Sequence, residues 1–169
     1  MEKNDTYYFH QTPKSLCDEL IKHVPLEQGD RVLESFRGEG NFYNSFPPFI
    51  EKDWCEIVDG RDYKDYDKEF DWVITNPPFR LEEDDGKRTN AFYKLLNYYS
   101  HRAKKGIAFL GNDTCFSTLT PSRLKELNGR GWFIHKIVCC AIKKWRGRYF
   151  FIIFKRQPCD FYNRIDGSF

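Results

Sequence analysis

The sequence predicts an α/β protein whose central sheet is doubly wound, mostly parallel, and completed by one antiparallel strand in a C-terminal hairpin. Short apolar runs alternate with amphipathic segments, which is the order expected when strands and covering helices follow one another. The last two apolar runs, 133–142 and 149–154, are joined by a short link that contains Gly147, which indicates the hairpin. With 169 residues, 40% of them hydrophobic, the chain has the size of one domain, which we expect to span residues 1–169.

The N-terminal part is expected to supply a helix, a strand and a glycine-rich loop. A helix over residues 12–24 begins at Thr12, a favoured N-cap followed by proline, which is favoured at the first helical position. A Gly-Asp turn then leads into an apolar strand over residues 31–35, which runs into the glycine-rich loop 36–40. A second helix is expected before the Pro-Pro pair at 47–48.

The remaining elements continue the alternation up to the hairpin. We expect strands over residues 54–58 and 70–75, a helix over 90–104, a strand over 106–110 and a helix over 121–127. The acid-rich residues 80–89 are expected to form a loop, a lid or a partner-binding segment. No apolar run approaches the length of a membrane span and the N-terminus has no apolar signal segment, so we expect an intracellular protein, cytoplasmic or nuclear, with no membrane partner.

The run Asn76-Pro77-Pro78-Phe79 follows the apolar strand residues 72–75 directly. Neither proline has an N–H and each fixes φ, so the strand stops there and the backbone is stiff. The Asn76 side-chain oxygen and the Pro77 carbonyl can both accept hydrogen bonds from one planar amino group, and Phe79 offers a face for a flat ring. This combination suits chemistry on an –NH2 group, although an ordinary turn is the simpler alternative.

The glycine-rich loop favours a cationic ligand over a dinucleotide. Gly38 and Gly40 follow the first strand, but the third glycine of the dinucleotide fingerprint would fall at Tyr43. Glu34 at the strand end would also repel a pyrophosphate. Both features count against a nucleotide-binding oxidoreductase.

The Asn-Pro-Pro-aromatic motif resembles that of class I S-adenosylmethionine-dependent amino-methyltransferases of the N6-adenine DNA methyltransferase type. Residues 32–40 are similar to the acidic-x-Phe-x-Gly-x-Gly signature of that family, except that Ser35 stands where proline is common. Residues 9–13 resemble its N-terminal Thr-Pro element, and the three motifs occur in the family's order. The resemblance implies a Rossmann-like methyltransferase sheet and S-adenosylmethionine as cofactor.

The resemblance also implies a cofactor contact for seven residues: Thr12, Glu34, Phe36, Gly38, Gly40, Glu56 and Asp62. Glu34 and the loop would hold the methionine end, Glu56 the ribose hydroxyls, and Asp62 the adenine amine. Asp59 competes with Glu56 and Asp62 for these roles, and a solvated acid in a glycine turn is the alternative for each. Only 36 residues separate the last loop glycine from the motif asparagine, so the helix usual between the second and third strands is expected to be shortened or missing.

The expected reaction is methyl transfer to the exocyclic amine of adenine in DNA, with Asn76, Pro77, Pro78 and Phe79 as catalytic residues. The base would have to leave the duplex first. RNA adenine, protein glutamine and a non-catalytic nucleic-acid-binding subunit are the alternatives. No histidine or cysteine pattern has metal-ligand spacing, so no metal is expected, and a partner subunit or a homodimer would supply target recognition.

Basic charge is concentrated in the last third of the chain. Residues 121–156 hold 10 Lys and Arg against one acid, whereas residues 1–120 hold 16 against 22. The hairpin link places Lys143, Lys144, Arg146 and Arg148 as candidate phosphate contacts, with Trp145 as a stacking group. A hairpin whose charges only keep a sheet edge soluble is the alternative.

Overall fold

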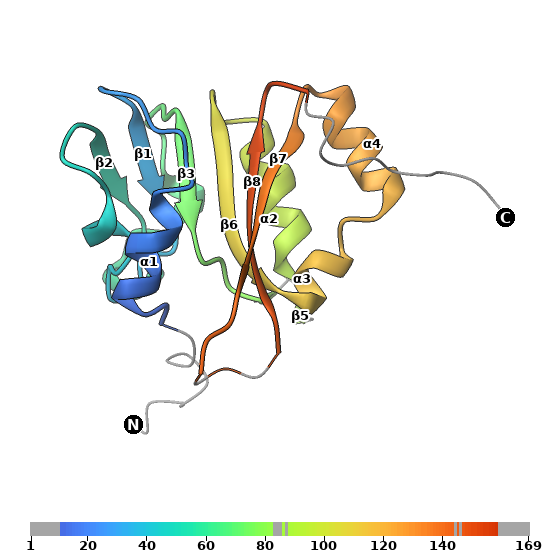
Figure 1. Ribbon diagram of the computed structural model, residues 1–169, viewed down its shortest axis with the longest axis horizontal. Helices are drawn as coiled ribbons and strands as arrows, with labels where there is room; N and C mark the ends of the chain where they lie inside the picture. Colours follow the sequence, from blue (N-terminus) through green and yellow to red (C-terminus); the bar gives the residue numbers. More distant parts are fainter. Residues whose placement is uncertain (1–10, 83–85, 87, 144, 146, 159–169) are drawn as a thin grey trace, which may run out of the picture.

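A six-stranded sheet forms the centre of the protein in the computed structural model (Figure 1). The structure describes residues 11–82, 86, 88–143, 145 and 147–158. In spatial order the strands are β2 (Glu51–Trp54), β1 (Arg31–Glu34), β3 (Trp72–Thr75), β6 (Gly106–Asn112), β8 (Tyr149–Lys155) and β7 (Phe133–Cys140).

The direction of β8 distinguishes it from the other strands of this sheet. β2, β1, β3 and β6 pair in parallel, whereas β8 is antiparallel to both β6 and β7. The predicted mostly parallel sheet with one antiparallel strand in a C-terminal hairpin is therefore confirmed. The parallel strands and β7 all end at the lower edge in Figure 1, so the polar residues that follow them share one edge.

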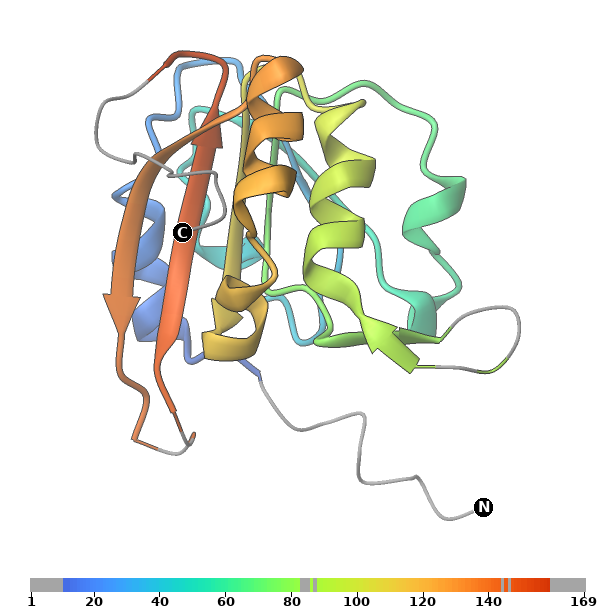
Figure 2. The same cartoon turned by 90° about the vertical axis from the view of Figure 1, so that its right-hand side faces the viewer.

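Helices cover both faces of the sheet. Figure 2 shows α1 (Lys14–Ile21) on one face, and α2 (Ala91–Ser100) and α4 (Pro121–Gly129) on the other. Two core clusters follow this division, because successive side chains of a strand point to opposite faces: Val32 belongs to the cluster that includes α1 side chains, and Leu33 to the cluster that includes side chains of α2 and α4. Within the described ranges, no helix has the length and apolar character needed to cross a bilayer.

The start of α1 differs from the prediction. The helix is shorter than residues 12–24, and its N-cap is Pro13, in an extended conformation and without a side-chain cap hydrogen bond. The expected N-cap role of Thr12 is therefore wrong. Its hydroxyl is instead used in a contact with a distant part of the chain, described below.

The strand predicted over residues 54–58 is also wrong. β2 ends at Trp54, and Ile57–Asp59 form a 3₁₀ turn that the Glu56 side chain caps and Gly60 closes in the left-handed conformation. The helix expected before the Pro-Pro pair is a single 3₁₀ turn, Tyr43–Ser45. Between β2 and β3, two short 3₁₀ turns replace the usual helix, as the short spacing predicted.

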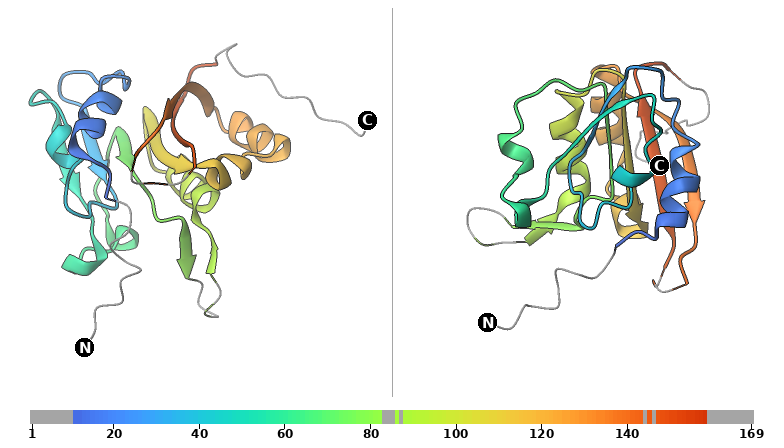
Figure 3. Two further views of the ribbon diagram at one scale, coloured as in Figure 1. Left: turned by 60° about the horizontal axis from the view of Figure 1, so that its bottom comes forward. Right: turned by 90° about the vertical axis from the view of Figure 1, so that its left-hand side faces the viewer.

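Two elements were not predicted. Residues Asp113–Ser117 form the short helix α3, and β4 (Arg80–Glu82) pairs with β5 (Arg88–Asn90) in an antiparallel hairpin where a loop was expected. Figure 3 shows this hairpin projecting away from the main sheet. Its two three-residue strands contain no apolar run, which is why periodicity did not reveal them.

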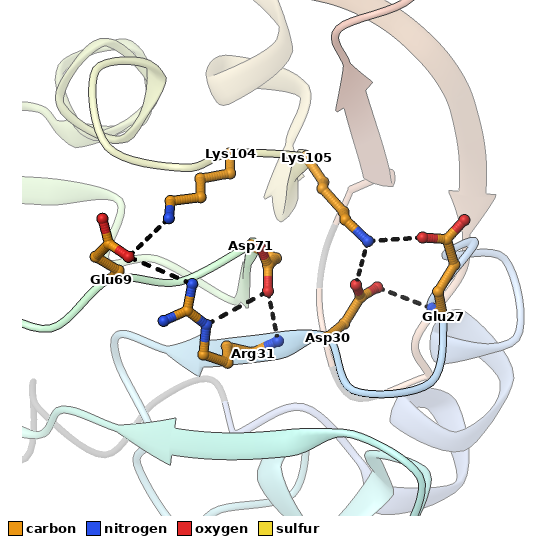
Figure 4. Close-up of polar contacts among 7 residues, drawn as sticks. All are labelled: Glu27, Asp30, Arg31, Glu69, Asp71, Lys104 and Lys105. Carbon is orange, nitrogen blue, oxygen red and sulfur yellow. Dashed lines mark hydrogen bonds and ion pairs between the residues drawn. The ribbon is translucent and has the colours of Figure 1, made fainter.

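Ion pairs join the amino ends of three neighbouring strands (Figure 4). Lys105, which precedes β6, donates to Asp30 and Glu27 at 2.6 Å each, and Asp30 is only 2% exposed. The backbone N–H of Arg31 donates to Asp71 Oδ2 at 2.8 Å, which ties β1 to the start of β3. These contacts fix the register of β1, β3 and β6 at the edge opposite the polar strand ends.

Candidate functional site

Three segments that are far apart in the sequence meet at the carboxyl edge of the sheet. Asn76 Nδ2 donates to Thr12 Oγ1 at 3.2 Å, and Asn41 Nδ2 donates to the Thr12 carbonyl at 2.8 Å. Thr12, which is 4% exposed, therefore connects the Asn-Pro-Pro-Phe motif to the segment that follows the glycine-rich loop. With Nδ2 used as the donor to Thr12, Oδ1 is the acceptor atom of the Asn76 amide.

The motif after β3 is held at its other end as well. Pro77 is buried, and Phe79 is half-buried and packs against both core clusters. The Phe79 carbonyl accepts a hydrogen bond of 3.0 Å from the backbone N–H of Ala91, the first residue of α2. The motif is thus fixed by Thr12 on one side and by α2 on the other.

The glycine-rich loop passes directly against the N-terminal segment. Gly38 and Gly40 have φ of +52° and +83°, a region that favours glycine. A Cβ on Gly38 would lie 2.6 Å from Gln11 Nε2, and the Glu39 N–H donates to Gln11 Oε1 at 3.2 Å. Gln11 lies within the Thr-Pro element of residues 9–13 but was not predicted as a site residue, because its contact with the loop depends on the tertiary approach of two distant segments.

Glu34 lies at the carboxyl end of β1 and is 2% exposed. Its Oε2 atom is buried and has no hydrogen-bond partner among the described residues. Burial raises the pKa of Glu34 to about 9, and the Tyr43 amide and the Arg37 charge offset only part of this effect. A buried carboxyl with one unsatisfied oxygen, beside a glycine loop, fits a ligand that brings a cationic group, such as the ammonium of a methionine moiety.

The two acids predicted to hold the ribose and the adenine amine serve as local caps. Glu56 Oε2 accepts from the Gly38 N–H at 2.7 Å, and its Oε1 accepts from the Val58 N–H at 3.3 Å. Asp62 Oδ1 accepts from the Lys64 N–H at 3.0 Å. A carboxylate has roughly four acceptor positions, so these bonds leave capacity for hydroxyl or amine donors.

Apolar side chains are exposed beside Glu56. Ile57 and Val58 are 57% and 70% exposed and, with Phe49, are the large hydrophobic side chains that are exposed in the described part of the chain. Phe36 is the first residue of the glycine-rich loop, and its ring centroid is 5.0 Å from that of Tyr63. Sequence reasoning missed Ile57 and Val58 because it placed them in a strand, where one of the two would be buried.

Asp59 is engaged elsewhere. It forms an ion pair with Arg37 of the glycine-rich loop. This pairing makes Asp59 a weaker candidate than Glu56 or Asp62 for a ligand contact, because its charge is already balanced.

The basic hairpin link lies at the same sheet edge as Asn76. Lys143 is exposed, and the Arg148 side chain is 83% exposed, with Nε 3.8 Å from Asp113 Oδ1. Trp145 is half-buried, with its ring centroid 4.8 Å from that of Tyr149. Lys144 and Arg146 lie outside the described residues. The link joins β7 and β8, which are three and two strand positions from β3, separations of about 14 Å and about 10 Å.

No cluster of three or more metal-ligating side chains is present in the ranges that the structure describes. The candidate site is therefore an edge of polar and apolar groups: an unpaired carboxyl, a glycine loop, two further carboxylates and the fixed amide of Asn76.

Solved structures with the same fold are methyltransferases. A protein from Listeria monocytogenes assigned to the class I S-adenosylmethionine-dependent methyltransferases matches 98% of this chain and 67% of its own, with 13% identity and a TM-score of 0.66. A modification subunit assigned to a type I restriction enzyme of Vibrio vulnificus matches 90% of this chain, with 13% identity and a TM-score of 0.61, and this chain spans only 45% of its length. A protein from Pyrococcus horikoshii assigned as an RNA methyltransferase covers 90% of this chain and 88% of its own, with 14% identity and a TM-score of 0.59.

The sequence itself places the chain in a family. Among curated proteins no match is found. Residues 6–138, more than three quarters of the chain, match the family described as Eco57I restriction-modification methylase. The chain therefore belongs to the Eco57I restriction-modification methylase family, and its class I methyltransferase fold implies S-adenosylmethionine as the methyl donor.

Proposed function

We propose that this methyltransferase acts on the exocyclic amine of adenine in DNA. The observation that carries the proposal is the Asn76 amide, which Thr12 holds at the carboxyl end of β3. β3 pairs directly with β1, the strand that ends at the buried carboxyl of Glu34. An amide acceptor and a cation-binding carboxyl on neighbouring strands can orient an amine toward a methyl donor. Membership of a restriction-modification methylase family supports DNA as the polymer.

The cofactor, when bound, supplies an electrophilic methyl group on a sulfonium. Glu34 would bind the ammonium of the cofactor's methionine moiety. Gly38 and Gly40 have no Cβ, so the loop backbone could lie close to the cofactor. Glu56 would accept from ribose hydroxyls and Asp62 from the adenine amine, with Thr12 and Phe36 at the border of the site. Ile57, exposed beside Glu56, would add an apolar contact to the adenine ring.

The target amine would donate two hydrogen bonds, one to Asn76 Oδ1 and one to the Pro77 carbonyl. These hydrogen bonds orient the nitrogen lone pair toward the methyl group. Pro78 restricts the backbone and so keeps the two acceptors in place. Phe79 would stack on a base that has left the duplex. Rate enhancement in this arrangement comes from positioning and from hydrogen bonds made as charge develops on the nitrogen.

Recognition of the polymer would involve the basic link between β7 and β8. We propose Lys143, Lys144, Arg146 and Arg148 as phosphate contacts and Trp145 as a stacking group. Trp145 is half-buried against Tyr149, so only part of its ring would stack on a base. We further propose that residues 1–169 form one methyltransferase domain, and that a partner subunit or a second copy supplies target recognition.

The test is transfer of a radiolabelled methyl group from S-adenosylmethionine to DNA duplexes, single-stranded DNA, RNA and protein, followed by digestion to nucleosides or amino acids. We expect label in N6-methyladenine from DNA. Asn76→Ala should lower the rate by about 10²- to 10³-fold while cofactor affinity stays within a few-fold. Asn128→Ala, on α4 near the opposite edge of the sheet, is the matched control and should leave the rate unchanged.

Other outcomes would replace the proposal. Label in RNA adenine would favour the RNA alternative, and label in glutamine would favour a protein substrate. Calorimetric binding of the cofactor without transfer to any pool would favour a non-catalytic nucleic-acid-binding subunit. An Asn76→Ala variant that retains full activity would remove Asn76 from the catalytic role.

A further inference from the structure

A tryptophan at the end of β2 lies between two arginines. The guanidinium carbons of Arg37 and Arg61 are 3.8 Å and 4.0 Å from the centroid of the Trp54 ring. Arg37 belongs to the glycine-rich loop, and Arg61 belongs to the segment that begins at Glu56. One indole ring therefore contacts a cation from each of the two loops that the proposed function assigns to the cofactor.

Ion pairs reinforce the same contacts. Arg37 pairs with Asp59, which lies on the other loop, so this ion pair crosses between the loops. Arg61 Nη2 lies 2.7 Å from Asp53 Oδ1, and Lys68 Nζ lies 2.8 Å from Asp53 Oδ2. We call the group Arg37, Asp53, Trp54, Asp59 and Arg61 the Trp54 clamp.

The charge on Asp53 is well supported. Burial raises its pKa, but hydrogen bonds from Lys68, from the Trp54 backbone and from Arg61 outweigh this effect and lower the pKa to about 2. Asp53 therefore stays ionised across the range in which an enzyme of this kind is assayed. The orientation of Arg61 on the ring does not depend on pH in that range.

The clamp supports the backbone groups that face the proposed ligand. The Arg37 N–H donates to the Cys55 carbonyl at 3.0 Å, and the next amide, that of Gly38, donates to Glu56 Oε2 at 2.7 Å. Glu56 and Arg61 exchange two backbone hydrogen bonds of 2.9 and 3.1 Å, which close the second loop. A shift of either arginine would therefore move the loop glycine or the ribose-binding carboxylate.

We propose that Trp54 is a positioning residue that holds the two cofactor loops at a fixed separation and so sets the affinity for S-adenosylmethionine. This inference rests on the proposed function of the site and deepens it. The ring is engaged by Arg37 and Arg61 and is assigned no contact with the reacting atoms. Its removal should weaken cofactor binding without changing the transfer step.

The test compares Trp54→Ala with Trp54→Phe, by calorimetric titration with S-adenosylmethionine and by steady-state kinetics. Trp54→Ala should raise Kd and KM for the cofactor by about 10-fold or more, with kcat at saturating cofactor within about 3-fold of the unchanged protein. Trp54→Phe retains a ring face for the arginines and should recover most of the affinity.

A matched control lies outside the clamp. Arg123 lies over the Tyr93 ring at 4.4 Å, so Tyr93→Ala removes a comparable contact on α2. Tyr93→Ala should lower thermal stability without changing cofactor Kd. If Trp54→Ala does not fold, Arg61→Met removes one side of the clamp and should still raise Kd several-fold.

Three results would overturn the inference. A folded Trp54→Ala with unchanged Kd would show that the clamp does not position the loops, and a loss of kcat at unchanged KM would assign Trp54 to the transfer step. A Kd that rises equally in Tyr93→Ala would reduce the effect to stability. Failure of the proposed function is seen separately, since an unmodified protein that binds no cofactor overturns both proposals, whereas one that binds but does not transfer still tests the clamp.

Discussion

The two edges of the central sheet treat their polar groups in opposite ways. At the amino edge, the buried Asp30 is balanced by Lys105, and Asp71 is satisfied by Arg31 (Figure 4). At the carboxyl edge, Glu34 Oε2 and Thr75 Oγ1 are buried with no hydrogen-bond partner among the described residues. The first edge stabilises the fold, whereas the second keeps polar groups that a ligand can satisfy.

Of the substitutions at the two edges, replacement of Glu34 by glutamine should have the largest effect, a loss of cofactor affinity. It removes a buried carboxyl that would pair with the cofactor cation, so affinity for S-adenosylmethionine should fall by about 100-fold or more, or about 3 kcal/mol. Calorimetric titration measures the loss. Glu39→Gln, on the exposed part of the loop, is the control and should bind with nearly unchanged affinity.

Glu34→Gln should raise the free energy of unfolding at neutral and alkaline pH, although it weakens cofactor binding. Burial raises the pKa of Glu34 from 4.5 to about 9, so between these values the folded state holds a proton that the unfolded state has released. The contribution of Glu34 to the free energy of unfolding is therefore full below pH 4.5 and is lost as the pH rises toward 9. Urea unfolding at pH 5, 7 and 9 should show this fall in the unmodified protein and a flatter profile in Glu34→Gln; equal slopes would contradict the assignment.

At the opposite edge, loss of a charge should destabilise the protein. Lys105→Met leaves the carboxylate of Asp30, 2% exposed, without its cation. Because the Lys105 side chain is 43% exposed, we expect about 2 kcal/mol, below the range of a fully buried pair. Lys104→Met, which breaks an exposed pair with Glu69, should cost much less, because solvent screens that pair. Equal losses in the two variants would argue against a special role for the buried Asp30.

A smaller effect is expected from the contact that orients Asn76. Thr12→Val keeps the shape of the side chain but removes the Oγ1 acceptor of the Asn76 amide. The amide then loses a contact that orients it, and kcat should fall by about 10-fold, with cofactor Kd within a few-fold. Thr12→Ser retains the hydroxyl and should stay close to full activity, and a Thr12→Val variant as active as Thr12→Ser would contradict this role.

Proton release offers the finest test of the carboxyl edge. A cation placed beside Glu34 favours its charged form, so cofactor binding near pH 7 should release about 0.5–1 proton from this residue. Calorimetry in two buffers with different ionisation enthalpies measures the number of protons. Release should disappear in Glu34→Gln, and its absence in the unmodified protein would mean that Glu34 does not meet a cation.

The sequence predicted the sheet because its information is local. Apolar runs and turn residues located β1, β3, β6, β7 and β8 to within a few residues, and the Gly147 link predicted the antiparallel pairing of the last two. β2 was displaced because its four residues, two of which are exposed, carry no apolar signal. The β4–β5 hairpin escaped prediction for the same reason.

The sequence predicted which residues form the candidate site, but not the hydrogen bonds and contacts between them. Spacing and residue type singled out Glu34, Gly38 and Asn76, but neither shows that the Thr12 hydroxyl accepts a hydrogen bond from Asn76 rather than from a helix N-terminus. The contact of Gln11 with Gly38 joins residues 27 positions apart. Such links depend on how the segments meet in three dimensions, which no periodicity records.

The length of the β4–β5 hairpin can change without a change in the fold around the Asn76 motif. Its stem is closed by the Arg80–Asn90 pair and by the hydrogen bond from Ala91 to Phe79, next to the motif. Beyond the Glu82–Arg88 pair, a change in length need not reach Asn76, because the stem absorbs it. The hairpin is thus a natural point of insertion, where related chains could acquire new recognition segments while the chemistry stays in place.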